Sequence, residues 1–393
     1  MQKTKDDIAP MDFEFATANR IIFGADKRLE LASLVKEYGH RVFLITGANT
    51  DRANWATELL DQNDIPCSSF QIVTEPTIDV VRQAICMALE ANADVVVAIG
   101  GGSVIDAGKA VAAMLTNEGR LMDYLEVIGE GQPLTQRSAP FIALPTTAGT
   151  GAEVTRNAVL GSTEHKLKVS MRSPFMLPAV ALVDPVLTHS MSPAVTASTG
   201  LDALTQLMEA FVSNKANPLT DGICREGLVR AARSIKSAYL GDDIFAREDM
   251  AMAGLFSGLA LANAKLGAVH GFAGPLGGMY PAPHGVICAR FLPAIMKANI
   301  TALEARNAGS PVLNRYQEVF RILTGSDDTT RGIKWIENLC DQLDVTPLKE
   351  YGIHSHAFPD IIEKAKASSS MKGNPIALTD DELETALCVA VQG

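Results

Sequence analysis

The first half of the chain alternates short apolar, β-branched runs with helical patterns, and this alternation restricts the fold more than any other feature. Five runs have the length and composition of buried strands, namely 41–46, 68–73, 95–99, 141–144 and 180–183. Helical patterns lie before and between them, at 25–38, 77–91 and 103–115. Strands joined by crossover helices run parallel, so the sequence predicts an α/β domain with a parallel sheet.

The second half of the chain has a different pattern. After Asp184 and Pro185 the strand signal stops, and Ser192 before Pro193 is a good helix start, because serine caps the first turn and proline fits within it. Helical periodicity then continues almost to the end. A chain of 393 residues exceeds the usual size of one core, so we expect two domains, residues 1–187 with the sheet and residues 188–393 built from helices alone.

Charge and composition argue against several classes of protein. The formal net charge of −11 disfavours a nucleic-acid partner, which needs a basic face. No window approaches about 18 unbroken apolar residues, and residues 1–10 lack the apolar run of a signal peptide. The six cysteines are scattered without a C-x-x-C pair, as is typical of thiols in a reducing compartment. We expect a cytoplasmic protein that binds neither nucleic acid nor a membrane.

A glycine-rich loop, GGGSVIDAGK at 100–109, follows the predicted strand at 95–99 and opens a helix. Such a turn directs backbone N–H groups and the positive end of a helix at one point, where a diphosphate fits. The loop is not the G-x-G-x-x-G fingerprint, because Ile105 occupies the position of its last glycine. Taken alone, it is explained better by a tight strand-to-helix turn.

A second loop of similar chemistry follows another predicted strand. The segment PTTAGTGAEVT at 145–155 carries two glycines and four hydroxyl side chains. Open α/β sheets bind ligands at the carboxyl ends of their strands. Two glycine–hydroxyl loops at that edge favour a nucleotide site over two unrelated turns.

Two histidines lie in an apolar stretch near the middle of the helical half. The segment AVHGFAGPLGGMYPAPHG at 268–285 has no charged residue, and its His270 and His284 are each followed by glycine. A buried histidine taken singly is more often hydrogen-bonded in a core than bound to a metal. Both interpretations stay open at this point.

Five motifs, in this order, resemble those of the iron-containing (group III) alcohol dehydrogenases: GGGSVIDAGK, PTTAGTGAEVT, ALVDP, TGLDAL and AVHG…PHG. The resemblance extends from about residue 13 to the last helices. It implies a Rossmann-like nucleotide-binding α/β domain followed by an all-α domain, the dehydroquinate synthase-like superfamily fold, with a metal in the cleft between the two domains. We also expect a homodimer.

The resemblance implies roles for individual residues, position by position. The residues that would hold the cofactor diphosphate are Gly100, Gly101, Gly102 and Ser103. Those that would line the cofactor cleft are Asp106, Thr146, Thr147, Thr150 and Lys168. Asp202, His270 and His284 match metal ligands and would form the catalytic centre. Two positions depart from the family pattern: Gln206 stands where a fourth ligand histidine is expected, and Gly274 where a histidine implicated in proton relay is often found.

The departure at Gln206 does not remove the predicted metal. Asp202 and Gln206 lie four residues apart, hence on one face of the predicted helix. Polar groups in such apolar segments would each cost about 1–3 kcal/mol if left unsatisfied. One aspartate and two histidines suffice, because a catalytic metal typically has three protein ligands and an open position. Gln206 would then be a weak oxygen ligand or a hydrogen-bond acceptor behind the ligands, and the metal Fe2+ or Zn2+.

The predicted activity is the NAD(P)-linked interconversion of an alcohol with an aldehyde or ketone, with the metal as Lewis acid on the substrate oxygen. Apolar residues after His270 suggest a wall for a small neutral or hydrophobic substrate: Phe272, Pro275, Leu276, Met279 and Tyr280. Two alternatives remain. One is a maleylacetate-reductase-like reductase of an oxo acid, and the other is a non-catalytic nucleotide-binding sensor.

The sequence also bears on the choice between the two nicotinamide cofactors. Family members that use NAD typically carry an aspartate just after an early strand, where it binds the ribose 2′-hydroxyl. Gly47 occupies that position here, and Arg52 lies nearby. Without the carboxylate nothing repels a 2′-phosphate. We therefore expect NADP(H) to be accepted at least as well as NAD(H).

Overall fold

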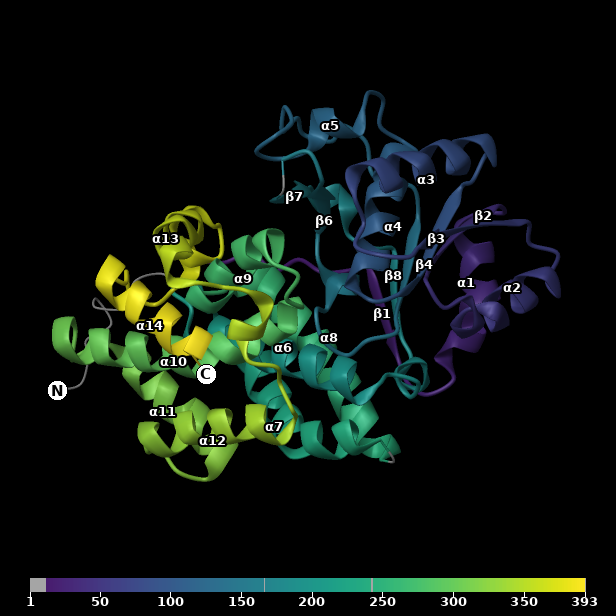
Figure 1. Ribbon diagram of the computed structural model, residues 1–393. Helices are drawn as coiled ribbons and strands as arrows, with labels where there is room; N and C mark the ends of the chain where they lie inside the picture. Colours follow the sequence, from purple (N-terminus) through teal and green to yellow (C-terminus); the bar gives the residue numbers. More distant parts are fainter. Residues whose placement is uncertain (1–11, 166, 242, 393) are drawn as a thin grey trace.

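The structure, a computed structural model, describes residues 12–165, 167–241 and 243–392. The sequence interpretation of residues 1–10 therefore lies outside the described part of the chain. The described residues form an α/β domain followed by a helical domain, toward the right and the left of Figure 1 respectively. The predicted fold class is confirmed.

Six parallel strands form the main sheet, in the order β1-β8-β5-β4-β2-β3. Their bounds are β1 Arg20–Phe23, β2 Val42–Gly47, β3 Cys67–Ile72, β4 Val95–Gly100, β5 Phe141–Pro145 and β8 Val180–Val183. All five strands predicted from the sequence are present. The sequence analysis missed β1, because the residues of this edge strand are exposed or half-buried and lack the buried apolar pattern of the other strands in the sheet core. It also missed the antiparallel hairpin of β6 (Asn157–Ser162) and β7 (Leu167–Arg172), whose residues are largely polar or small.

Helices cover both faces of the sheet. Those of the α/β domain are α1 Leu31–Tyr38, α2 Asn54–Asp61, α3 Ile78–Glu90, α4 Gly102–Met114 and the short α5 Leu121–Tyr124. Phe43 and Ile45 of β2 pack on the face covered by α3 and α4, whereas Val42 and Leu44 pack on the face covered by α1 and α2. Successive strand residues point to opposite faces, so strands that are apolar throughout form a sheet buried on both sides.

The strand order reverses between β2 and β4. From β2 the chain moves to β3 on one side and then returns past β2 to β4 on the other. Open α/β sheets bind their ligands at such a switch point, outside the carboxyl ends of the strands. Gly47 ends β2 and Gly100 ends β4, so two of the predicted cofactor positions border the switch point.

The helical domain is built around α6. Its helices are α6 Pro193–Val212, α7 Pro218–Leu240, α8 Ile244–Ala264, α9 Ala268–Met279, α10 His284–Arg306, α11 Pro311–Thr324, α12 Thr329–Gln342, α13 Phe358–Ala367 and α14 Asp380–Gln392. The Ser192 side chain accepts a hydrogen bond from the Val195 N–H, so the predicted start of α6 is confirmed. Helices α7, α8 and α10 pack on α6, which is buried along most of its length.

One helix passes a test for membrane spans by length and composition. This helix is α10, but 72% of its apolar window is buried inside the protein, as in the core helix of a folded domain. Helices α8 and α9 pass the same test only as a pair, and a bend of 102° separates them. The bend lies just before His270, one of the predicted metal ligands.

The two domains touch where the loop after β5 meets α8. A Cβ atom on Gly151 would lie 2.3 Å from Cα of Gly258, and the φ angle of Gly151 is +59°. The Ser257 hydroxyl donates to the Gly149 carbonyl at 2.9 Å. Only glycine permits this approach, and it adopts the left-handed conformation without strain. The main chains of the two domains are therefore in direct contact here, with no side chain between them.

Candidate metal centre

Helix α6 contributes three polar side chains to the interior of the helical domain. Asp202, Gln206 and Glu209 follow one another at single-turn spacing and so lie along one face of the helix. Each residue is at most 3% exposed. Buried polar groups require partners, so the groups that these three contact decide what the site can do.

Helices α9 and α10 bring the two histidines to Asp202. His270 is the third residue of α9, just after the bend that separates α8 from α9. His284 is the first residue of α10, and Cys288 lies one turn further along the same face. Ligating atoms of Asp202, His270, His284 and Cys288 all lie within 4.8 Å of one another. The structure thus gathers the three predicted ligands and adds a thiol that the sequence analysis did not single out.

The cluster is enclosed on one side and accessible on the other. Oδ1 of Asp202 lies 3.2 Å from Nε2 of His270 and 3.7 Å from Nε2 of His284. The His270 side chain is 6% exposed, whereas that of His284 is 41% exposed. A small molecule can therefore approach the ligating atoms from the side of His284.

Glu209 determines which nitrogen of His270 faces the cluster. Its Oε1 accepts from the backbone N–H of Val269, and its Oε2 accepts from that of His270, at the start of α9. Oε2 also lies 2.7 Å from Nδ1 of His270. Because a carboxylate accepts, Nδ1 carries a proton, and Nε2 is the ring nitrogen that faces Asp202. The sequence offered one signal for Glu209, its position two turns after Asp202 on the same helix.

These contacts fit a divalent cation. Nε2 of His270 and Oδ1 of Asp202 face each other, and either a proton on Nε2 or a divalent cation between the two atoms satisfies both. A histidine that donates its other N–H to a carboxylate is the usual arrangement around a protein-bound metal. The carboxylate, imidazole and thiol groups of the cluster are ordinary ligands of zinc and of related transition metals.

Gln206 contacts Asp202 rather than the histidines. Its Nε2 donates to Oδ2 of Asp202 at 3.1 Å, whereas its buried Oε1 has no hydrogen-bond partner in the part of the chain that the structure describes. We expected either an oxygen ligand or an acceptor at this position. The observed bond makes Gln206 a donor that holds the second oxygen of Asp202, and its Oε1 stays available as the oxygen ligand that the sequence analysis considered.

The pKa values of the cluster follow from its burial and its charges. Burial disfavours the charged form of His270, but its contacts with Cys288, Asp202 and Glu209 outweigh burial and raise its pKa well above the usual value. Burial likewise opposes ionisation of Asp202, but His284 and His270 outweigh it and lower the pKa of the carboxyl. Burial raises the pKa of the Cys288 thiol to about 12.

We expect Glu209→Gln to weaken metal binding by about 10–100-fold, the range found when a group that orients a ligand is changed. The amide is uncharged and supports the imidazole of His270 less strongly than a carboxylate does. Competition with a chelator measures the dissociation constant, and the exposed Glu248→Gln serves as the control. An unchanged constant in Glu209→Gln would show that the carboxylate only caps α9.

The two glycine loops meet at neighbouring strands of the sheet. Gly100 lies opposite Pro145 in the pairing of β4 with β5, and the Thr146 N–H donates to the Gly100 carbonyl at 2.9 Å. A Cβ atom on Gly102 would lie 2.9 Å from Oγ1 of Thr150, so the loops touch. The loops therefore form one surface at the carboxyl edge of the sheet, beside the switch point.

The remaining predicted cofactor residues also have contacts within the protein. A Cβ atom on Gly101 would lie 3.4 Å from Thr147, and Ser103 is exposed at the start of α4. Asp106 accepts from Lys109 Nζ at 3.2 Å and from the Val159 N–H at 3.0 Å, which ties α4 to the β6–β7 hairpin. Asp106 therefore has a structural contact that the sequence analysis did not foresee.

Lys168 of β7 lies close to both domains. Its Nζ is 2.6 Å from Oε1 of Glu75, and a Cβ atom on Gly277 of α9 would lie 3.7 Å from Nζ. Desolvation, with the positive charges of His270 and Lys168, lowers the pKa of His284. Lys168 thus links the two domains electrostatically.

The expected apolar wall is wrong for two of its members. Phe272 and Leu276 are fully buried in the core of the helical domain, and Phe272 stacks on Phe291 with ring centroids 4.7 Å apart. Residues two apart on a helix point about 200° away from each other. Since His270 faces the cluster, Phe272 faces the core instead.

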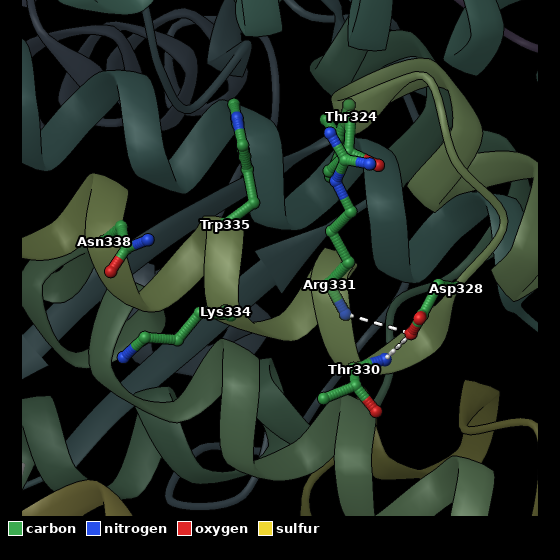
Figure 2. A pocket seen from close by; sticks show the side chains of 8 residues that line it. Thr324, Asp328, Thr330, Arg331, Lys334, Trp335 and Asn338 are labelled. Carbon is green, nitrogen blue, oxygen red and sulfur yellow. Dashed lines mark hydrogen bonds between the residues drawn. The ribbon is translucent and has the colours of Figure 1, made fainter.

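A separate surface hollow lies at the end of α11 and the start of α12 (Figure 2). Its acidic residue, Asp328, accepts from the backbone N–H groups of Thr330 and Arg331 and thereby caps α12. None of its lining residues belongs to the metal cluster or to the glycine loops. The hollow is therefore not part of the site developed above.

Solved structures with this fold define the class of the protein. The crystal structure of a 1,3-propanediol oxidoreductase matches with a TM-score of 0.89 and 30% identity, covering 97% of this chain and 100% of that one. A sulfoacetaldehyde reductase from Bifidobacterium kashiwanohense, solved in complex with NAD+, matches with a TM-score of 0.87 and 29% identity, covering 98% of this chain and 100% of that one. The class is that of the two-domain, metal-dependent oxidoreductases.

Sequence comparisons identify the family within that class. The family model for iron-containing alcohol dehydrogenase matches residues 18–185, and that for the C-terminal part of the Fe-containing alcohol dehydrogenase family matches residues 196–391. Alcohol dehydrogenase 4 of Saccharomyces cerevisiae is 32% identical over 369 residues, which cover 92% of this chain and 94% of the yeast protein. The chain belongs to the iron-containing alcohol dehydrogenase family.

Family membership confirms the predicted activity. The protein is an enzyme that interconverts alcohols with aldehydes or ketones, with a divalent metal and a nicotinamide cofactor. The oxo-acid reductase and the non-catalytic sensor are not favoured, because the relatives are alcohol dehydrogenases and aldehyde reductases.

Proposed function

We propose that Asp202, His270 and His284 hold the catalytic metal of this alcohol dehydrogenase. The observation that carries the proposal is the convergence of Asp202 Oδ1 with the Nε2 atoms of both imidazoles, with Glu209 behind His270. Bound there, a divalent cation supplies Lewis-acid polarisation of an alcohol or carbonyl oxygen, and the nicotinamide accepts or donates hydride.

The chain's own residues prepare the site for that chemistry. Glu209 keeps the proton on Nδ1 of His270, and Gln206 holds Oδ2 of Asp202. His284 stands at the accessible side of the cluster, where substrate enters. Gly274, which lies on the exposed side of α9, offers no imidazole for proton transfer, so the substrate proton leaves through water or the cofactor ribose.

On the cofactor side, we assign the diphosphate to Gly100, Gly101, Gly102 and Ser103. The threonines of the second loop and Lys168 border the same edge of the sheet and would line the cofactor, and Asp106 would support the loop from behind. The contact between the loops and their place at the switch point support this assignment.

Two measurements on the purified protein test the function together. Metal analysis should find close to one divalent metal ion per chain, and a panel of small alcohols and aldehydes should give turnover with NAD(H) or NADP(H). Metal-loaded protein that binds nucleotide but turns over no member of the panel would contradict the proposed function.

We propose that the cofactor is NADP(H) at least as readily as NAD(H). Gly47 ends β2 at the switch point, and a Cβ atom there would meet only Val104, at 3.8 Å. Arg52, the nearby cation, donates to the Ser190 carbonyl at 2.8 Å and is otherwise exposed.

We expect Gly47→Asp to shift cofactor preference towards NAD(H). A carboxylate at this position accepts from a ribose 2′-hydroxyl and repels a 2′-phosphate, and the space around Gly47 admits the side chain. The ratio of kcat/KM for the two cofactors measures the shift, and Gly47→Ala controls for the added Cβ atom. A wild-type enzyme with strong preference for NAD(H) would overturn the proposal.

We further propose a cytoplasmic homodimer whose domains divide at residues 187 and 188. Six cysteines without disulfide partners support a reducing compartment. The last strand of the sheet ends at Val183 and α6 begins at Pro193, which supports the division.

A further inference from the structure

We propose that Cys288 is a fourth protein ligand of the catalytic metal. Its Sγ then replaces the imidazole that position 206 lacks, and the ligand set becomes one carboxylate, two imidazoles and one thiolate. The inference rests on the proposed function, because it takes Asp202, His270 and His284 as the other ligands. It adds the fourth ligand and, with it, a preference among metals.

The distances match a metal-centred arrangement. Sγ of Cys288 lies 3.6 Å from Nε2 of His270 and 3.7 Å from Nε2 of His284. Zinc bonds of about 2.3 Å to sulfur and 2.0–2.1 Å to nitrogen or oxygen, at tetrahedral angles, separate sulfur from nitrogen by about 3.6 Å and nitrogen from oxygen by about 3.3 Å. Asp202 Oδ1 lies 3.2 and 3.7 Å from the two nitrogens. A cation fits among these atoms without a large displacement of any of them.

The fold directs Cys288 to this position, and among the described residues its thiol has contacts only within the cluster. It lies one turn after His284 on α10, so a single helix face carries both. The residue is fully buried, and the contacts of its thiol are with the two imidazoles and Asp202. By contrast, Cys340, also buried in this domain, donates to the Ala289 carbonyl and faces the core.

The residue at position 206 supports the same conclusion. Position 206 carries an amide in place of the expected imidazole, and its Nε2 donates to Oδ2 of Asp202, so it supplies no nitrogen donor to the cluster. The missing nitrogen donor is compensated by a sulfur donor from another helix. On binding, the S–H proton passes to solvent and a sulfur–metal bond forms, with no change in oxidation state.

A thiolate changes which metal the site prefers. Thiolate is a soft ligand that favours zinc, whereas iron and zinc differ less in their affinity for imidazole and carboxylate. We therefore infer that this chain favours Zn2+ over Fe2+ more strongly than its own Cys288→Ala variant does. His284 remains the accessible side, so a fifth position for substrate stays open.

Cobalt substitution tests the ligand directly. Wild-type protein loaded with Co2+ should show a thiolate-to-cobalt charge-transfer band in the near ultraviolet. Cys288→Ala should lose this band, and its affinity for Zn2+ should fall by about 100-fold or more, beyond the 10–100-fold range of an indirect effect. Cys224→Ala, which removes another buried thiol of the same domain, should keep both the band and the affinity.

The outcomes separate this inference from the proposed function. One outcome is that Co2+ binds to the wild-type protein and not to His270→Ala, while the wild-type spectrum has no charge-transfer band. Cys288 is then not a ligand, and the site of three residues still holds. If Co2+ binds no more weakly in His270→Ala than in the wild type, the proposed metal site itself fails. The wild-type spectrum needs no variant, so poor folding of Cys288→Ala would not prevent a decision, and Cys288→Ser offers a closer substitute in size.

Discussion

Metal content and turnover are expected to fall together when His270 is replaced by alanine. The change removes the nitrogen nearest to Asp202 Oδ1 and leaves the buried carboxylate of Glu209 without its ring partner. Removal of a direct ligand should weaken metal binding by more than the 10–100-fold that follows when a group behind a ligand is changed. We therefore expect metal affinity and turnover to fall by more than about 100-fold. Elemental analysis after dialysis and the initial rate with the best alcohol measure the two effects.

The controls for His270→Ala come from the same chain. The exposed His354→Ala should keep full metal and activity. Asp202→Asn should be less severe than His270→Ala, because the amide oxygen can still coordinate. Full metal and full activity in both His270→Ala and His284→Ala would mean that the imidazoles are packed side chains, as a single buried histidine usually is.

A second large effect is expected at the cofactor loop, where Gly101→Val should weaken cofactor binding by on the order of 100-fold or more. The backbone of Gly101 is extended (φ −75°, ψ −174°), and a Cβ atom would meet nothing closer than Thr147 at 3.4 Å, so the fold tolerates a side chain. The side chain would stand where the diphosphate approaches the N-terminus of α4. Two lost hydrogen bonds to a charged group, each about 1.5–3 kcal/mol, give this magnitude.

The neighbouring glycine is a less informative site for this test. A Cβ atom on Gly102 would lie 2.9 Å from Thr150 Oγ1, so a substitution there disturbs the loop with or without a cofactor. Gly222→Ala on α7, which has open space around it, controls for the general effect of a substituted glycine. Calorimetric titration with NAD(P) measures affinity, and unchanged metal content separates the loop from the metal centre. If Gly101→Val still binds the cofactor as the wild type does, the loop is only a tight turn and does not hold the diphosphate.

The sheet and its carboxyl edge could be predicted because their signal is local. A central strand such as β4 is apolar on both faces, so Val95–Gly100 reads as a strand without any knowledge of its neighbours. The β6–β7 hairpin has no such signal, since polar residues such as Asn157 and Lys168 occupy strand positions. The hairpin packs on α4, where the Val159 N–H donates to Asp106, and such contacts cannot be read from a short segment.

The metal centre could be predicted only in part for a similar reason. Asp202, His270 and His284 lie in recognisable motifs, whereas Glu209 and Cys288 are defined by the face on which two helices meet. Helical spacing alone connects them to the motif residues, and many buried side chains share that spacing. The error at Phe272 has the same origin, because nearness in sequence to His270 does not mean a shared helix face.

The contact between Gly151 and Gly258 restricts how the two domains can move against each other. Where main chain meets main chain, no change of rotamer can lengthen or shorten the contact, so the two domains cannot come closer at this point. An opening or closing motion would then be a rotation about the glycine pair. Such a pivot would alter the angle between the cofactor edge of the sheet and the accessible face of His284, and it would leave the separation at the pivot unchanged. A methyl group at Gly258 would act there as a wedge, altering the geometry of hydride transfer without touching a metal ligand or the cofactor.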